Sequence, residues 1–175
     1  MYPFVNYVRT YLSIVFVAIA LAGCANNPQS LQAIEPIPEI NIENSANRLA
    51  LHGYDPVAYF KEQAAVAGSP EITTQWRGAV WQFANKQNRA AFVAKPEFYA
   101  PQYGGYCAIA LSWGIIADID PDSWYIEDNK LYLNNNAVVH KIWLQDIDGN
   151  ILDATENWRY IHRYPIHSKP KHNHL

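Results

Sequence analysis

The side chains that could carry chemistry in this chain are two cysteines, six histidines and a few carboxylates. Cys107, His52 and Asp55 offer a thiolate, an imidazole and a carboxylate, a donor set that suits copper or zinc. His140 is a fourth possible donor. Because none of these residues stands at an i, i+4 or Cys-x-x-Cys spacing, a shared metal site depends on the fold bringing them together.

Each of these residues also has a structural alternative. A free cysteine is among the most buried residue types, and the sequence favours Cys107 as a buried, inert thiol over a metal ligand or a reactive thiol. Asp55 precedes Pro56, a pair typical of a helix start at which the aspartate caps free N–H groups. His52, beside Gly53, is the strongest candidate ligand without a thiol.

Histidines also gather at the C-terminal end of the chain. They are His162, His167, His172 and His174. His-rich tracts can bind copper, nickel or zinc, which predicts weak, mobile metal binding. The alternative, which the sequence favours, is that residues 162–175 form a solvated, disordered tail in which the histidines are incidental.

Signatures of catalysis are absent from the sequence. It holds no Gly-x-Ser-x-Gly, no phosphate-binding glycine loop and no His-Glu-x-x-His. Asp118, Asp120 and Asp122 alternate, but the glycine and glutamate of a calcium loop are missing. A nucleophilic Cys107 with a histidine base rests on no motif. We therefore expect a protein that is not an enzyme.

The first 24 residues point to export. Residues 12–22 are almost purely apolar and follow Arg9, the only charge before them. This run is shorter than the ~20 residues of a membrane-spanning helix but suits the core of a secretory signal peptide. It leads into Leu21-Ala22-Gly23-Cys24, which resembles the lipobox of bacterial lipoproteins. The resemblance implies that residues 1–23 are removed and that Cys24 carries acyl chains such as palmitate, which hold a protein stably on a membrane.

Lipidation implies a protein anchored to a membrane and facing the periplasm. Because Ala25 rather than an aspartate follows Cys24, the outer membrane is favoured over the inner one. An ordinary secretory signal or an uncleaved anchor is the alternative. The mature chain would keep 152 residues, with 12 basic against 16 acidic. That length suffices for one domain, and the charge argues against nucleic acid as a partner and against electrostatic binding to anionic lipid. The membrane is the predicted partner, and the sequence identifies no protein partner.

The elements that would position these residues follow from periodicity and turns. Pro36 and Pro38 predict an extended tether over residues 24–44, and a globular domain follows over 45–161. Hairpins are predicted from 71–76 with 79–83 and from 124–127 with 131–133. Helices are predicted at 56–63, 85–94, 138–144 and 151–158, with a short one starting at Pro96 and a turn at 148–150. In the helix at 138–144, residues 138, 139, 142 and 143 are expected to form the apolar side that faces the core. The fold class is therefore α+β, with small antiparallel hairpins packed against short helices.

The second half of the domain repeats the plan of the first. Residues 81–83 and 131–133 lie 50 apart, as do Phe92 and Ile142. Two copies of a strand–strand–helix–helix unit would explain this spacing. Chance similarity between small amphipathic segments is the open alternative.

Several strings together carry a family resemblance. They are Leu-His-Gly-Tyr-Asp-Pro-Val-Ala-Tyr-Phe at 51–60, Tyr-Ala-Pro-Gln-Tyr-Gly-Gly-Tyr-Cys-Ala at 99–108, and residues 81–83, 88–92 and 130–134. Over residues 48–160 the chain resembles the exported group of bacterial YHS-domain proteins. The resemblance implies a fold related to metal-sensing modules, and hence a membrane-anchored lipoprotein that handles copper or zinc.

The sequence departs from the family at its metal site. YHS modules carry a Phe-Cys pair and often a second cysteine, whereas Phe83-Ala84 stands here and the following residues lack a cysteine too. The soft thiolate pair that selects copper(I) or zinc is therefore absent at that place. The alternative function is a non-catalytic structural or protein-interaction lipoprotein with no metal site.

Overall fold

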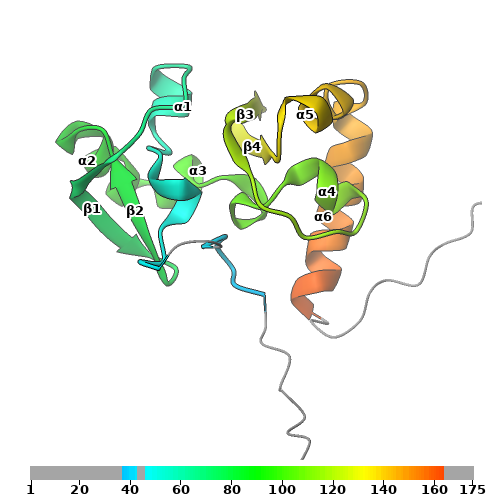
Figure 1. The fold of residues 1–175 in the computed structure, drawn as a ribbon, viewed down its shortest axis with the longest axis horizontal. Coiled ribbons are helices and arrows are strands. Elements are labelled where there is room, and N and C mark those ends of the chain that lie inside the picture. The colour runs from blue at the N-terminus through cyan, green and yellow to red at the C-terminus, as the bar shows by residue number, and fades with distance from the viewer. Residues whose placement is uncertain (1–36, 43–45, 164–175) are drawn as a thin grey trace, which may run out of the picture. The chain divides into compact units, whose positions relative to one another are not determined.

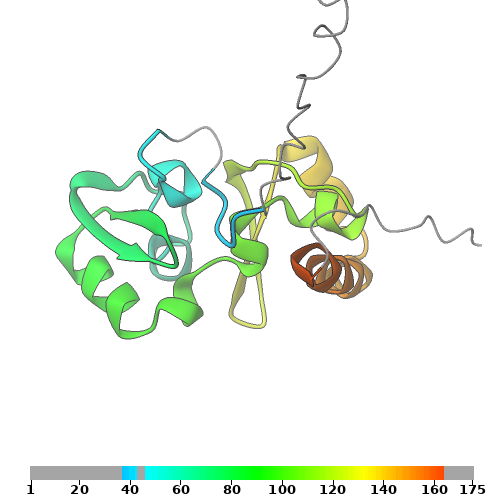
Figure 2. The ribbon, with the colours of Figure 1, turned by 90° about the horizontal axis from the view of Figure 1, so that it is seen from below.

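The computed structural model describes residues 37–42 and 46–163. Two halves follow one another along the chain, each with a two-stranded antiparallel hairpin and helices around it (Figures 1 and 2). The first half contains η1 (Ala50–Gly53), α1 (Ala58–Lys61), β1 (Ser69–Trp76), β2 (Ala79–Phe83), α2 (Lys86–Ala94) and α3 (Pro96–Tyr99). The second contains η2 (Gln102–Gly105), α4 (Ala108–Ser112), β3 (Asp120–Glu127), β4 (Lys130–Asn134), α5 (Ala137–Trp143) and α6 (Ile147–Arg163). The predicted α+β class is confirmed.

The two hairpins have the same register. In the first, Trp76 pairs with Ala79 and Thr73 with Gln82; in the second, Glu127 pairs with Lys130 and Trp124 with Leu133. Each ladder shifts register at the same place, before Thr73 and before Trp124. Corresponding pairs are thus 51 residues apart, one more than the offset of 50 seen in the sequence.

Both hairpins turn through residues with positive φ. Arg77 and Gly78 have φ values of 47° and 73°, and Asp128 and Asn129 have 48° and 58°. Positive φ at both central residues characterises the two-residue turn that matches the twist of the strands. Each hairpin then leads into a helix capped by an asparagine, at Asn85 and Asn136.

Aromatic side chains fill the core of each half. In the first half Phe92 contacts both Trp81, with ring centroids 4.9 Å apart, and Phe83, at 5.3 Å. In the second half Tyr132 contacts Trp143 at 5.3 Å. Burial of such large rings is the main source of stability in a domain of this size.

Tyr59 joins the two halves through its ring and its hydroxyl. The Tyr59 ring meets Trp124 edge-on at 5.4 Å, and the Tyr59 hydroxyl donates to the Pro121 carbonyl at 3.0 Å. Burial, and after it the nearby Asp122 carboxylate, raises the pKa of Tyr59 above its usual value. The phenol is therefore a neutral hydrogen-bond donor at any physiological pH.

Most predicted elements are confirmed, and three differences have local causes. The turn predicted at 148–150 is wrong, because Asp146 accepts a hydrogen bond from the Gly149 N–H at 3.0 Å and α6 already runs through this stretch. The helix predicted to end near Gln63 ends at Lys61, since Gln63 has a φ of 51° and its amide donates to the Tyr59 and Phe60 carbonyls.

The third difference concerns the apolar side of α5. Residues 138, 139, 142 and 143 were expected to face the core together, but only Trp143 is fully buried. Val139 is partly buried against the core, whereas Val138 is 71% exposed and Ile142 38% exposed. The helix is short, so one large indole suffices to anchor it.

The last residues of the predicted tether pack on the domain. We call residues 37–42 the docked segment; it runs between the two halves in Figures 1 and 2. Asn41 donates from its backbone to the Gly104 carbonyl at 2.8 Å and from its amide to the Gly105 carbonyl at 3.1 Å. Gly104 has a φ of 64°, and a Cβ there would collide with the Glu39 carbonyl. The pair Gly104-Gly105 thus permits a close approach, and the neighbour is this segment.

Candidate functional site

Cys107 lies in the core, as the sequence favoured. It immediately precedes α4, is 1% exposed, and its Sγ accepts a hydrogen bond from the Asn135 N–H at 3.2 Å. Burial raises the pKa of the thiol, against the opposing effect of the backbone N–H groups of Ala110, Asn135 and Ile109. A buried, protonated thiol is a poor nucleophile and a poor ligand, so Cys107 has the properties of a structural residue.

Asp55 is fully buried and accepts hydrogen bonds in the turn before α1, but α1 begins at Ala58 rather than at the predicted Pro56. Its Oδ1 accepts from the Val57 N–H at 2.8 Å, and its Oδ2 accepts from the Ala84 N–H at 2.9 Å and from the Asn88 amide at 2.8 Å. These three donors satisfy the buried carboxylate and tie α1 to the end of β2 and to α2.

His52 pairs with the Asp118 carboxylate. Its Nε2 lies 2.9 Å from Asp118 Oδ1, and Asp118 also accepts from the Asn41 amide at 2.9 Å and from the Ile119 N–H at 2.8 Å. Burial raises the pKa of Asp118, but these hydrogen bonds and the His52 ring outweigh it and leave the pKa below its usual value. Asp118 thus links η1, the docked segment and the start of β3.

The structure does not bring the predicted metal ligands together. Among residues 37–42 and 46–163, no three histidine, cysteine or carboxylate side chains lie close enough to hold one ion. His162 belongs to α6. Cys24 and the tail residues His167, His172 and His174 lie outside the described residues.

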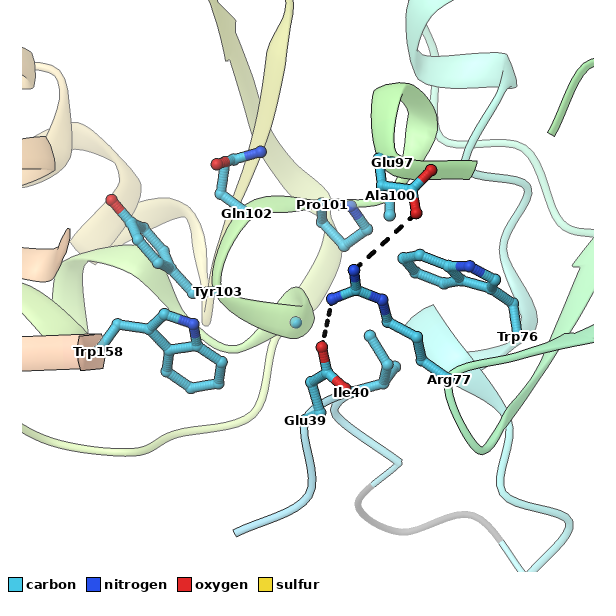
Figure 3. Close-up of a pocket in the computed structure, with 11 residues that line it drawn as sticks. Glu39, Ile40, Trp76, Arg77, Glu97, Ala100, Pro101, Gln102, Tyr103 and Trp158 are labelled. Atoms are coloured by element: carbon cyan, nitrogen blue, oxygen red, sulfur yellow. Dashed lines mark hydrogen bonds and ion pairs between the residues drawn. The ribbon is translucent and has the colours of Figure 1, made fainter. Parts of the chain in front are cut away.

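The structure instead contains a pocket that sequence reasoning missed. It has a volume of about 190 Å³ and opens where the β1–β2 turn, the docked segment, η2 and α6 meet (Figure 3). Trp76 and Arg77 lie on one side, with Tyr103 and Trp158 on the other (Figure 3). The remaining lining residues are Glu39, Ile40, Glu97, Ala100, Pro101, Gln102 and Gly104.

Arg77 organises the charged part of the pocket. Its guanidinium stacks on the Trp76 ring, 4.6 Å from the centroid, pairs with Glu39, and lies 3.9 Å from Glu97 Oε1 (Figure 3). Cation–π stacking and two carboxylates hold the guanidinium in one place. All three charged side chains keep substantial exposure, so they remain reachable from solvent.

The aromatic side of the pocket is held rigidly. The Tyr103 hydroxyl lies 3.0 Å from Thr155 Oγ1 and 3.2 Å from the Ile151 carbonyl, both in α6. Trp158 packs against Tyr106 with ring centroids 5.7 Å apart. Two hydrogen bonds and ring packing thus preform this wall before any ligand arrives.

The sequence contained little to mark this pocket. Arg77-Gly78 was readable as a turn and Trp158 as part of a helix, but they are separated by 80 residues.

Comparison with known proteins adds no identification. No protein-family model, no curated protein and no solved structure matches the chain. Within the part of the chain that the structure describes, no helix has both the length and the apolar character needed to span a bilayer.

Proposed function

We propose that this protein is an exported, lipid-anchored lipoprotein of the YHS type whose folded domain binds a small ligand without catalysing a reaction. The observation that carries the binding function is the preformed pocket between Trp76–Arg77 and Tyr103–Trp158. Aromatic walls with a few convergent polar groups are the usual composition of a ligand site. The structural roles of Cys107 and Asp55 favour this function over a metal-handling one.

The anchor and the pocket are close along the chain in this proposal. Cys24 would carry the acyl chains, and Glu39 and Ile40, 15 and 16 residues further on, form part of the pocket wall. A docked segment that contributes to the wall would hold the pocket at a limited distance from the membrane, on its periplasmic side.

Lipidation is tested by Cys24→Ala in the full-length chain, followed by fractionation and labelling with palmitate. We expect the variant to leave the outer-membrane fraction and to lose the label. Unchanged attachment with retained label would overturn the anchor.

Ligand binding is tested by ligand-observed NMR with a library of ring-sized fragments, on the full-length protein and on Trp158→Ala. We expect a set of fragments whose signals are lost in the variant and kept in Trp113→Ala, a matched control because Trp113 is exposed and outside the pocket. If every binding fragment behaves identically in both variants, the pocket is not the site.

We also infer that the two halves are copies of one ββαα unit. The identical ladders support this, as do the asparagine caps at Asn85 and Asn136, also 51 residues apart. A crystal structure in which the two hairpins differ in register would contradict the inference.

A further inference from the structure

The charges around the pocket select against charged ligands. Arg77 lies between the carboxylates of Glu39 and Glu97, so the three groups carry a net charge of about −1. An anionic ligand would meet two carboxylates, and a cationic one would have to compete with Arg77 for the Trp76 face and for both acids. A neutral ligand avoids both penalties.

Arg77, Glu39 and Glu97 together can form hydrogen bonds with the hydroxyl groups of a ligand. A hydroxyl both donates and accepts, and here guanidinium N–H donors stand beside carboxylate acceptors. Gln102 also lines the pocket. A ligand with several adjacent hydroxyls can therefore bond to both members of each ion pair without separating them.

The apolar walls and the volume of the pocket determine the shape of the ligand that it can hold. The Trp158 indole lines the pocket, and an indole suits the C–H face of a saturated ring. The volume of about 190 Å³ lies below the ~300–1,000 Å³ of pockets for drug-sized ligands. The pocket thus accommodates one ring rather than an extended molecule.

We propose that the pocket binds a single neutral sugar ring, either as a free monosaccharide or as the terminal unit of a glycan. This inference rests on the proposed ligand-binding function and assigns its ligand class. The hydroxyls would bond to Arg77, Glu97 and Gln102, and the ring would lie beside the Trp158 indole.

The probes are glucose and N-acetylglucosamine as neutral rings, glucuronate and glucosamine as their charged counterparts, and cellotriose as a glycan end. Each is titrated by calorimetry into the full-length protein in detergent micelles. We expect at least one neutral ring to bind ~10-fold or more tightly than both charged rings. Cellotriose binding more tightly than glucose identifies a glycan end as the source, and equal binding identifies a free sugar.

Glu97→Gln and Trp158→Ala test the location. Glu97 is exposed, so its substitution should leave folding intact while weakening sugar binding ~10-fold, the loss expected for one charge-assisted hydrogen bond. Trp113→Ala should bind as the wild type does.

Three results would overturn the sugar assignment. They are no heat from any neutral sugar, tighter binding of glucuronate or glucosamine, and sugar binding unchanged by both pocket variants. If fragments still bind in a Trp158-dependent manner while no sugar does, the proposed ligand-binding function stands and this ligand class is wrong.

Discussion

Asp55 and Cys107 have equivalent structural roles in the two halves of the domain, because each accepts a hydrogen bond from the residue that follows a hairpin. Asp55 accepts the N–H of Ala84, the residue after β2, and Cys107 accepts the N–H of Asn135, the residue after β4. One partner is a carboxylate that also binds the Asn88 amide; the other is a thiol in an apolar setting. Two of the three candidate metal ligands of the domain, Asp55 and Cys107, therefore each connect the end of a hairpin to the turn before a short helix.

The burial of Cys107 predicts slow reaction with thiol reagents. In a Cys24→Ala background Cys107 is the only cysteine of the chain. We expect a disulfide reagent to label it ~100-fold more slowly in the native protein than in urea, because reaction requires local opening and a thiolate. Labelling at the unfolded rate, with circular dichroism showing an intact fold, would contradict the buried thiol.

Asp118 predicts an acid dependence of stability. Its pKa in the folded state lies below the ordinary value of 3.8, so its contribution is present above that value and is lost as the pH falls through the lowered pKa. Asp118→Asn should therefore lower the free energy of unfolding at pH 6, and the difference from wild type should shrink towards pH 3.

Urea unfolding at several pH values measures this difference. Asp153→Asn, an exposed position on α6, serves as the control and should behave as the wild type does at every pH. A stability loss in Asp118→Asn that stays constant between pH 6 and pH 3 would show that the ionised carboxylate is not the stabilising form.

At the scale of elements, local signals were sufficient for most of the fold. Alternation with turn residues located both hairpins, and Asn85 and Pro96 marked helix starts that the structure confirms. The failures came where a tertiary or side-chain contact decided the outcome. Gly149 is typical of a turn, but in the structure its N–H donates to the Asp146 carboxylate and it lies in the first turn of α6.

The candidate site could not be predicted in the same way. Cap and turn signals lie within a few residues of each other, whereas the pocket depends on residues 39, 77, 97, 103 and 158 coming together. No periodic pattern in the sequence indicates that these distant residues come together. Likewise, His52 and Asp118 are 66 residues apart in the sequence. The sequence therefore contains no sign that these two side chains form a pair.

The β3–β4 turn predicts a matched pair of variants. Asn129 has a φ of 58°, which alanine disfavours by about 1 kcal/mol and glycine adopts freely. Asn129→Ala should lower the unfolding free energy by about that amount, and Asn129→Gly should preserve or slightly raise it. Equal stabilities of the two variants in chemical denaturation would argue against a positive-φ turn.

At the scale of the whole molecule, metal binding by the C-terminal histidines can be tested separately from metal binding by the folded domain. Any binding of copper(II) or zinc by the full-length chain should be weak and should disappear when His167, His172 and His174 are replaced by alanine. Cys107→Ala and His52→Ala should leave it unchanged, because Cys107 is buried and His52 is paired with Asp118. Tight binding that survives the tail substitutions and is lost in Cys107→Ala would instead support a metal-handling domain.

We propose that this protein meets its ligand in the pocket between the two halves. The most direct measurement is a crystal structure of the protein soaked with its strongest-binding sugar or fragment. We expect ligand density between Trp158 and Arg77, in contact with Glu97 or Gln102. Density for the ligand elsewhere on the protein, with this pocket filled by solvent alone, would contradict it.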